Sequence, residues 1–365
     1  MNSLRLTLFV LFLHGLTWPV QGGALSVKEL AAVDAAMRAE MDRQKAVGVA
    51  LGVIREGEIV YAKGYGFADR EEEIPVSIKT MFRWASISKS VTAVAAMQLV
   101  EEGKLNLDDD VRRHVPEFPD KGDRITVRQL LSHQGGIVHY TNGKVVRTKR
   151  EYESKHPYQD VIPALDTFKE SPLVNPPGEK YSYSTHGYIL LSAVVERAGK
   201  QRFAEQVQKR VCTPLGMMFL QPDYQWVNIP HRAAGYLLRN DQVIRSTDTD
   251  VSWKLGGGGF ISTVEDLARF GIGLMERKLV NENTEQMMWT VKQPSSGKLT
   301  KYALGFTVEG QGAELKISHN GSQEKAKTRL VIYPRQRHGM IVMSNSRHAD
   351  PGKFTTEAYR ALVNK

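Results

Sequence analysis

The stretch that decides the fold is RWASISKSVTAVAAMQLVEEGK, which runs from Arg83 to Lys104. It opens with serines around one lysine and continues as an apolar run of Val, Ala, Met and Leu that predicts a buried helix. Ser86 and Lys89 are three positions apart, so they share one face of that helix. A serine hydroxyl attacks poorly until its proton is removed, and an amine in a desolvated pocket can help because burial lowers its pKa. Since a helix start also supplies N–H groups that stabilise negative charge, the stretch predicts an attacking alcohol and its amine.

The S-x-x-K pattern is weak evidence by itself, because it occurs three times in the chain. The copy at Ser295 lies in a polar loop, and the copy at Ser322 lies in a predicted turn between strands. Only Ser86 opens an apolar helix after a β-rich segment. The alternative is that these serines only cap a helix and that Lys89 lies at the surface.

A second motif lies in PPGEKYSYSTHGYILLSAVVERAG, residues 176–199. Tyr183 and Thr185 stand just ahead of a predicted helix in this stretch. A phenol close to a lysine ammonium ionises more readily, so it can serve as general base and then return the proton to the leaving group. Tyr181 is the rival position, but Tyr183 has the hydroxyl of Thr185 two places on to orient a substrate. The alternative is ordinary packing of a tyrosine at a helix start.

A third motif is His319-Asn320-Gly321, followed by Ser322 and the predicted strand TRLVIYP. A glycine at a strand edge lets a substrate backbone approach and pair with the strand. The backbone N–H of Ser322 is then a candidate oxyanion donor, together with the N–H of Ser86. The H-x-G pattern also occurs at His133, where a structural histidine at a helix end is the favoured interpretation.

Composition narrows the class of protein. Lys and Arg outnumber Asp and Glu by 49 to 40, but the densest basic run, residues 144–155, is interrupted by acidic residues and has no ladder of stacking aromatics. This argues against a nucleic-acid partner. The single Cys212 excludes an internal disulfide framework, and the scattered histidines have no metal-ligand spacing. No metal and no cofactor is therefore expected.

Residues 1–23 predict a secretory signal peptide. One arginine precedes the apolar run LTLFVLFL, and a helix breaker and small residues follow it. The run is too short to span a bilayer permanently. An uncleaved anchor and a mitochondrial transit peptide are the alternatives, and the single arginine argues against the second. We expect an exported protein, secreted or periplasmic, with an organelle lumen as the less favoured location.

The order of elements predicts an α+β fold. A helix capped by Ser26 precedes two β-rich runs around Glu56-Gly57, which is a hairpin signal, and strands return near the C-terminus before a final helix from about Pro351. Strands at both ends predict one antiparallel sheet built from the two chain ends and flanked by helices, with a mostly helical lobe inserted. We expect one domain over residues 24–365, with a sheet lobe at about 25–80 and 296–365 and a helical lobe at about 81–295.

The order and spacing of the three motifs resemble the serine β-lactamase and penicillin-binding superfamily, whose motifs are S-x-x-K, S-D-N or a tyrosine equivalent, and K-T-G. The stretches FRWASISKS, LLSHQGGIVHY, YSYSTHGYILLSAVVERAG and GGGGFISTVEDLARFG resemble its class C and esterase branch, and within it mitochondrial serine β-lactamase-like proteins and their bacterial relatives. The resemblance implies an acyl-enzyme on Ser86, with Lys89 and Tyr183 handling protons and His319 in the third-motif position.

Two departures from that pattern bear on the substrate. His319 stands where the lysine of K-T-G would be, and Thr185 stands where the class C branch has asparagine. An imidazole is mostly neutral at pH 7, so it does not grip a carboxylate as a lysine does. We therefore expect cleavage of peptide or small amide bonds. The alternatives are an esterase of the same mechanism, a weak β-lactamase, and a non-catalytic self-assembling scaffold. The resemblance also allows a homo-oligomer or filament.

Overall fold

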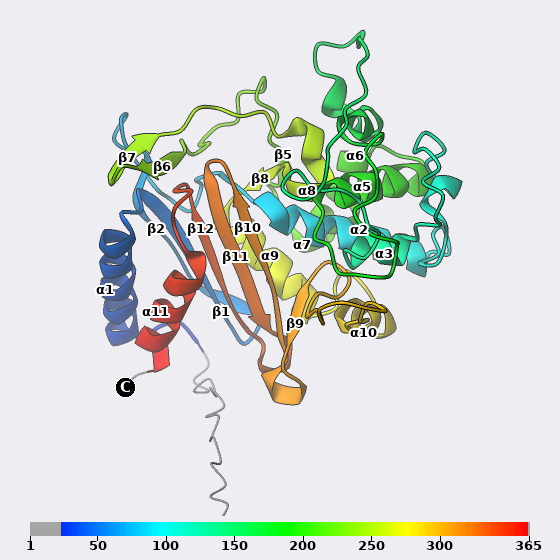
Figure 1. Cartoon of the computed structure of the whole chain (residues 1–365). Coiled ribbons are helices and arrows are strands. Elements are labelled where there is room, and N and C mark those ends of the chain that lie inside the picture. The colour runs from blue at the N-terminus through cyan, green and yellow to red at the C-terminus, as the bar shows by residue number, and fades with distance from the viewer. Residues whose placement is uncertain (1–22, 364–365) are drawn as a thin grey trace, which may run out of the picture.

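The computed structural model describes residues 23–363, so the predicted leader lies outside the described part apart from its last residue. The described chain has a large sheet on one side and a helical region on the other (Figure 1). Within residues 23–363, no helix has both the length and the apolar character that crossing a membrane requires.

The large sheet has seven strands in the order β3-β2-β1-β12-β11-β10-β9, and every neighbouring pair is antiparallel. The strands from the two ends of the chain meet where Val49 of β1 pairs with Ser344 of β12. The predicted fold class is therefore confirmed. The strands are β1 (Gly48–Arg55), β2 (Glu58–Asp69), β3 (Ile74–Pro75), β9 (Thr307–Glu309), β10 (Lys316–Gln323), β11 (Ala326–Tyr333) and β12 (His338–Ser344).

The hairpin predicted at Glu56-Gly57 joins β1 to β2. Both residues have positive φ, 55° and 81°. A two-residue turn of this hand matches the right-handed twist of the flanking strands, which is why the short connection is stable. Glu56 is not a glycine, so it adopts the left-handed region at some conformational cost.

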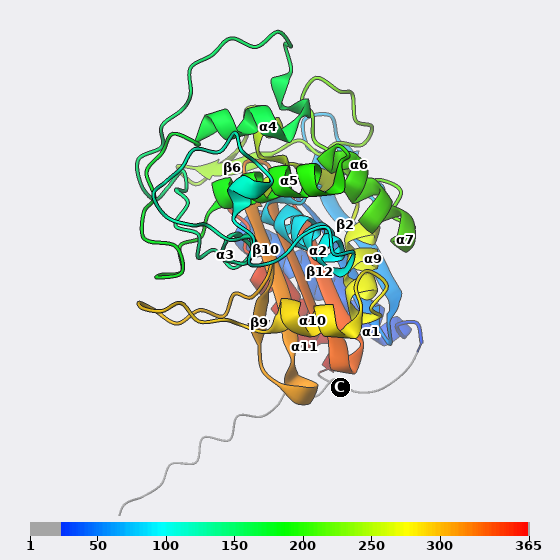
Figure 2. The same ribbon diagram turned by 90° about the vertical axis from the view of Figure 1, so that its right-hand side faces the viewer.

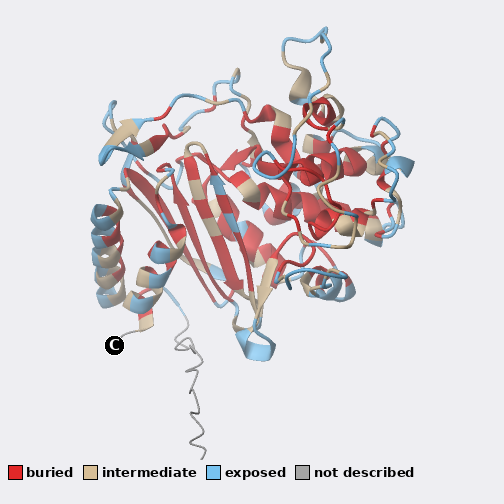
Figure 3. Cartoon of the chain, viewed as in Figure 1, coloured by how far each residue is buried: buried red, intermediate tan, exposed pale blue. Residues whose placement is uncertain are grey.

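Helices cover both faces of the large sheet. Helices α1 (Val27–Gln44) and α11 (Pro351–Val363) pack on one face, where they share an apolar cluster with β1 and β12. Helix α9 (Val264–Met275) contacts β1, β2, β11 and β12 from the other face. Figure 3 shows that α1 and α11 expose their outer sides while the strands between the layers are buried. The predicted capping box of α1 is present, because Ser26 and Glu29 bond each other's backbone N–H.

The helical region is built around α2 (Ser88–Glu101) and α5 (Thr185–Gly199), which contact each other and the short α8 (Leu255–Gly258). Every residue of α2 from Ser88 to Met97 is buried. Figure 2 views the molecule from the side of this region. Shorter helices complete it: α3 (Val127–Leu131), α4 (Val161–Ala164), α6 (Phe203–Val207), α7 (Thr213–Leu215) and α10 (Glu282–Trp289).

The middle of the chain also forms two small sheets. One has the order β4-β8-β5, and the other is the hairpin β6-β7. Their strands are β4 (Phe82–Arg83), β5 (Gln221–Pro222), β6 (Tyr236–Arg239), β7 (Gln242–Arg245) and β8 (Phe260–Ser262). Strand β4 leads directly into the predicted nucleophile segment, so this small sheet fixes where that segment begins.

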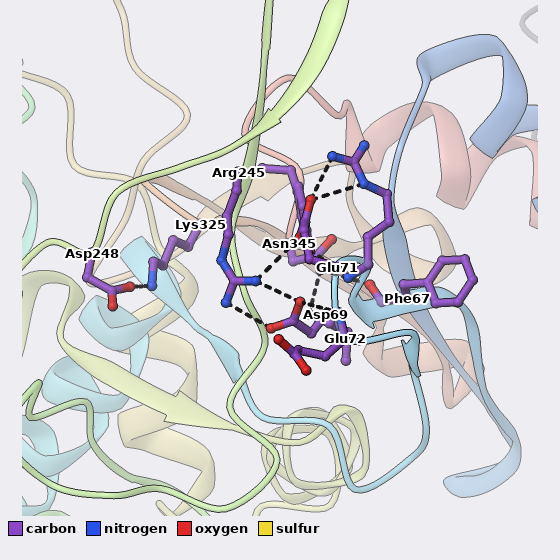
Figure 4. A network of polar contacts seen from close by, with 11 residues as sticks. Phe67, Asp69, Glu71, Glu72, Arg245, Asp248, Lys325 and Asn345 are labelled. Atoms are coloured by element: carbon purple, nitrogen blue, oxygen red, sulfur yellow. Dashed lines mark hydrogen bonds and ion pairs between the residues drawn. The ribbon is translucent and has the colours of Figure 1, made fainter.

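A polar network fastens the β6-β7 hairpin to the end of β2 (Figure 4). Arg245 binds both carboxylate oxygens of Asp69 at 2.7 and 2.8 Å. Asn345 donates to the carbonyl oxygen of Phe67 at 3.0 Å. Farther along the same segment, Asp248 forms an ion pair with Lys325 in the turn between β10 and β11. The network therefore holds the turn that follows the third motif.

Candidate active site

Ser86 lies in a single 3₁₀ turn (Ala85–Ile87) between β4 and α2. The preceding Ala85 is fully buried and has a φ of 48°, which is the left-handed region that few residues other than glycine adopt. This turn lets the chain leave the strand and enter the helix with Ser86 at the corner. Ser86 is partly exposed, while its neighbours from Met81 to Met97 are buried. The sequence therefore leaves one hydroxyl accessible on an otherwise buried segment.

Lys89 is completely buried, and its Nζ lies 3.1 Å from Oγ of Ser86. The same nitrogen donates to the carbonyl oxygen of Gly257 at 2.6 Å and to Oγ1 of Thr185 at 3.2 Å. Burial holds the pKa of Lys89 well below its usual value, and the nearby charge of Lys254 adds to this. A neutral amine has two hydrogens for Gly257 and Thr185. Its lone pair is then left for the proton of Ser86.

Tyr183 lies against the other side of the lysine. The centroid of its ring is 4.9 Å from Nζ of Lys89. Burial raises the pKa of Tyr183 above its usual value, and an interaction with the Ser86 side chain offsets this only in part. The expected ready ionisation of the phenol is therefore not supported, because loss of hydration outweighs the neighbouring amine, which is itself disfavoured as a cation. Burial thus favours the neutral form of both groups, the protonated phenol of Tyr183 and the free amine of Lys89.

Two histidines that the motif analysis did not assign to the site orient the segment that carries Tyr183 and Thr185. Nδ1 of His133 accepts the N–H of Ser184 at 3.1 Å, and Nδ1 of His139 accepts the N–H of Thr185 at 3.1 Å. Burial lowers the pKa of His133 well below its usual value and that of His139 to about 4. Both rings are thus neutral at pH 7, as an acceptor nitrogen requires. The stretch LLSHQGGIVHY contains them, but only the fold shows what they bind.

His319 is buried on β10, and both of its ring nitrogens have partners in the protein. Nδ1 lies 2.8 Å from the carbonyl oxygen of Asn320 and must donate to it. Nε2 lies 2.9 Å from the hydroxyl of Tyr302 and is left as the acceptor. Burial, with a contribution from Lys89, lowers the pKa of His319 to about 3. The third-motif position therefore presents no cation to a substrate at neutral pH.

Gly321 allows β10 to pack directly against the nucleophile turn. A Cβ at this position would lie 2.4 Å from the carbonyl oxygen of Trp84 and 2.0 Å from Oγ1 of Thr328. The sequence predicts room for a substrate here, but the space that the glycine leaves is filled by the protein's own backbone and side chains. Ser322, the next residue, is exposed. Since β9 pairs with β10 only from Lys316 to Ser318, no strand covers Ser322 on that side.

The fold thus brings together residues from distant parts of the chain. Ser86, Lys89, Tyr183 and Thr185 share one cluster, and β10 with His319 and Gly321 lies beside the turn of Ser86. Ser295, the serine of another S-x-x-K copy, bonds the carbonyl oxygen of Gly178 on an exposed loop. Among residues 23–363, no three His, Cys, Asp or Glu side chains gather as a metal site would require.

This fold and geometry are those of a serine hydrolase, and comparison with known proteins gives the family. The chain matches the family described as Beta-lactamase over residues 33–365 and belongs to that family of serine hydrolases.

One relative and two solved structures are similar to this chain. The chain is 31% identical over 386 residues to the human serine beta-lactamase-like protein LACTB, mitochondrial, and the alignment covers 81% of this chain and 70% of that protein. The structure superposes on the octameric penicillin-binding protein homologue from Pyrococcus abyssi with a TM-score of 0.76, at 25% identity, covering 92% of this chain and 78% of that one. The D-amino acid amidase from Ochrobactrum anthropi SV3 gives a TM-score of 0.76 at 20% identity, covering 92% and 99%, which shows a shared fold.

Proposed function

We propose that this protein is a serine hydrolase that cleaves peptide or small amide bonds through an acyl-enzyme on Ser86. The proposal depends above all on the 3.1 Å distance between Oγ of Ser86 and Nζ of Lys89, whose pKa burial holds well below its usual value. A neutral amine at hydrogen-bonding distance from a hydroxyl is the arrangement that general-base activation needs.

Acylation in this proposal carries one proton, in net, from Ser86 to the leaving nitrogen and exchanges a carbon–nitrogen bond for a carbon–oxygen bond. Oγ of Ser86 bonds to the carbonyl carbon, its proton passes to Nζ of Lys89, and the carbonyl π electrons move to the oxygen. The oxyanion then collapses and the carbon–nitrogen bond breaks. The leaving nitrogen takes the phenolic proton of Tyr183, which regains one from Lys89. The raised pKa of Tyr183 supports the role of acid, because the phenol stays protonated at neutral pH.

Deacylation repeats the steps with water as the nucleophile. Water gives a proton to Lys89 as it attacks the ester carbon, and the carbon–oxygen bond to Ser86 breaks. The oxygen of Ser86 takes that proton back from Lys89, and the carboxylic acid leaves. We propose the N–H groups of Ser86 and Ser322 as oxyanion donors in both halves. Loss of one such donor typically costs about 2.7–4 kcal/mol of transition-state stabilisation.

Labelling with a fluorophosphonate probe tests the proposal, because the probe reacts only with an activated serine. We expect wild-type protein to be labelled and Ser86→Ala to show no labelling. Ser295→Ala is the matched control, since that serine also stands in an S-x-x-K sequence but lies on an exposed loop. Labelling of Ser86→Ala at the wild-type level would overturn the assignment. No labelling of any form would favour a non-catalytic scaffold.

A substrate panel separates the remaining alternatives of the same mechanism. Matched peptide amides and p-nitrophenyl esters distinguish an amidase from an esterase by their kcat/KM values, and nitrocefin tests for β-lactam hydrolysis. A neutral His319 in place of the K-T-G lysine supports amide cleavage over antibiotic hydrolysis. Nitrocefin turnover that exceeds amide turnover would contradict this preference.

We also propose export to the periplasm or the cell exterior. The basic, apolar and small-residue sections of residues 1–23 support this. Mass spectrometry of the protein recovered after expression is expected to find an N-terminus near Ala24. An intact N-terminus on intracellular protein would contradict it. Similarity to an octameric homologue supports the further proposal of a homo-oligomer.

A further inference from the structure

A cavity of about 630 Å³ opens beside the third motif, and Ser322 lies in its wall. Two residues of this wall carry hydrogen-bond donors, Gln323 on β10 and Lys254 just ahead of α8. Helix α8 also supplies the carbonyl oxygen of Gly257 that binds Lys89. The cavity is therefore continuous with the elements that build the candidate active site.

Lys254 is buried without a partner. Only 9% of it is exposed, and no hydrogen bond or ion pair joins its Nζ to another residue of the described chain. Its recorded contact is the ring of Trp253, whose centroid lies 5.6 Å from Nζ. Nζ is not one of the fully buried unpartnered atoms of the described chain, so it faces the cavity. A cation that has so little contact with water and no acceptor is costly, so proteins pair such groups or use them to bind anions.

Gln323 adds a second unsatisfied donor to the same wall. It is 8% exposed, and among the described residues its Nε2 has no hydrogen-bond partner. A buried amide left unpaired destabilises the protein, so an unpaired Nε2 indicates a bound acceptor or another compensating role. An acceptor that enters the cavity would satisfy both Gln323 and Lys254.

The acidic groups near Lys254 are engaged elsewhere. Glu324 forms an ion pair with Arg347 at 2.8 Å. Asp250 accepts from the backbone N–H and the hydroxyl of Ser252, each at 2.9 Å. Arg147, also in the cavity wall, is exposed at the rim. The cavity therefore keeps an excess of positive charge that its own carboxylates do not cancel.

We infer that this cavity binds a carboxylate on the substrate, with Nζ of Lys254 and Nε2 of Gln323 as its donors. A carboxylate fits because it is an anion with two acceptor oxygens, one for each donor. Lys254 then supplies, from the helical side, the cation that His319 does not supply at the third motif. The expected preference for a carboxylate-bearing substrate rests on the proposed hydrolase function. The binding of a carboxylate in the cavity does not depend on that function.

A matched pair of esters tests the catalytic consequence. The p-nitrophenyl monoester of glutaric acid carries a free carboxylate, and the corresponding methyl ester is its neutral twin. We expect the wild type to prefer the anionic ester in kcat/KM, and Lys254→Met to lower this preference at least tenfold. Lys254→Arg should retain most of it. Lys28→Met, on the exposed side of α1, should leave it unchanged.

Binding to an inactive protein separates the inference from the proposed function. In the Ser86→Ala background, calorimetry with monomethyl glutarate is expected to show binding that weakens at least tenfold in Lys254→Met and is reduced in Gln323→Leu. Equal affinity with and without Lys254, or no difference between the two esters in wild-type enzyme, would overturn the carboxylate site. Binding without any ester hydrolysis would support the site and count against the hydrolase.

Discussion

Lys89→Met is expected to lower kcat on a p-nitrophenyl ester by about 10²–10⁴-fold, which is the usual contribution of a positioned general base. The amine lies 3.1 Å from Oγ of Ser86 and has no substitute in the site. Tyr183 is another group of the site that can exchange protons, but burial raises its pKa, so it stays a phenol and cannot accept the serine proton at neutral pH. Methionine preserves the length and apolar stem of the side chain while removing the nitrogen.

The pH dependence of activity follows from the lowered pKa of Lys89. The reaction needs a neutral amine, so activity should fall as the pH drops through the lowered pKa of Lys89 and should hold above it. Residual activity of Lys89→Met should lack this acidic limb. An acidic limb at the same pH in both proteins would assign it to another group.

The pH dependence of stability gives an independent measure of the pKa of Lys89 in the folded protein. In the unfolded chain Lys89 keeps its proton up to its ordinary pKa of 10.5, whereas in the folded protein it loses the proton at lower pH. Between these values the unfolded chain binds one more proton, so the free energy of unfolding of the wild type rises with pH relative to Lys89→Met. The expected slope is about 1.4 kcal/mol per pH unit.

Urea unfolding at several pH values measures that slope. Lys104→Met is the matched control, because Lys104 is an exposed lysine just past the C-terminal end of α2. The free energy of unfolding of this variant should show no such slope relative to the wild type. A flat difference between wild type and Lys89→Met would mean that Lys89 is charged in the folded protein. Direct proton abstraction by its amine would then be wrong.

The fold and the closeness of Ser86 to Lys89 could be predicted from the sequence, because both follow from patterns of neighbouring residues and from the order of those patterns along the chain. The capping box at Ser26, the turn at Glu56-Gly57 and the apolar run after Lys89 each depend on neighbouring residues, and the structure has all three. The antiparallel sheet from both chain ends followed from strands at each terminus. Periodicity carries this information without any knowledge of tertiary contacts.

Features that depend on distant contacts were not predictable in this way. His133 and His139 bind backbone N–H groups about fifty residues later in the chain, and no local pattern indicates it. The stretch YALGFTVEG predicts a strand, but only Thr307–Glu309 forms one. Its glycine, Gly305, has a φ of 89° and donates to the carbonyl oxygen of Leu131, so tertiary packing replaces the strand there. The packing of Gly321 against the backbone of Trp84 was not predictable for the same reason, because the two residues are far apart in the sequence.

The buried ion pair behind the nucleophile segment should contribute strongly to stability. Arg83 on β4 donates from Nε to Asp223 at 2.5 Å, and both side chains are buried. The same guanidinium binds the carbonyl oxygen of Thr249 at 2.8 Å and lies 3.4 Å from that of Glu324. Arg83 therefore ties the strand before Ser86 to the turn after β10.

Asp223→Ala is expected to lower the free energy of unfolding by about 3–5 kcal/mol, because it leaves the charge of Arg83 buried without its counter-ion and also breaks the ion pair of Asp223 with Arg232. Asp223→Asn should cost less, since the amide keeps one acceptor oxygen for the guanidinium. Urea unfolding with Arg360→Ala as control calibrates the effect. That arginine pairs with Glu357 on the surface of α11 and should change stability by at most about 1 kcal/mol.

A double mutant separates the ion pair from simple loss of packing. Arg83→Met combined with Asp223→Leu removes the buried pair and fills the space, and it leaves unpaired only the partly exposed Arg232, which also lies 2.9 Å from Asp223. The double mutant should therefore be more stable than Asp223→Ala alone. Its activity should nevertheless fall, because the bonds from Arg83 to Thr249 and Glu324 are lost and the segment carrying Ser322 is no longer tied to β4. If the double mutant is less stable than Asp223→Ala, the hydrogen bonds of Arg83 to the two loops outweigh the desolvation of its charge. A loss in Asp223→Ala no greater than in Arg360→Ala would mean that water reaches the guanidinium when its partner is removed.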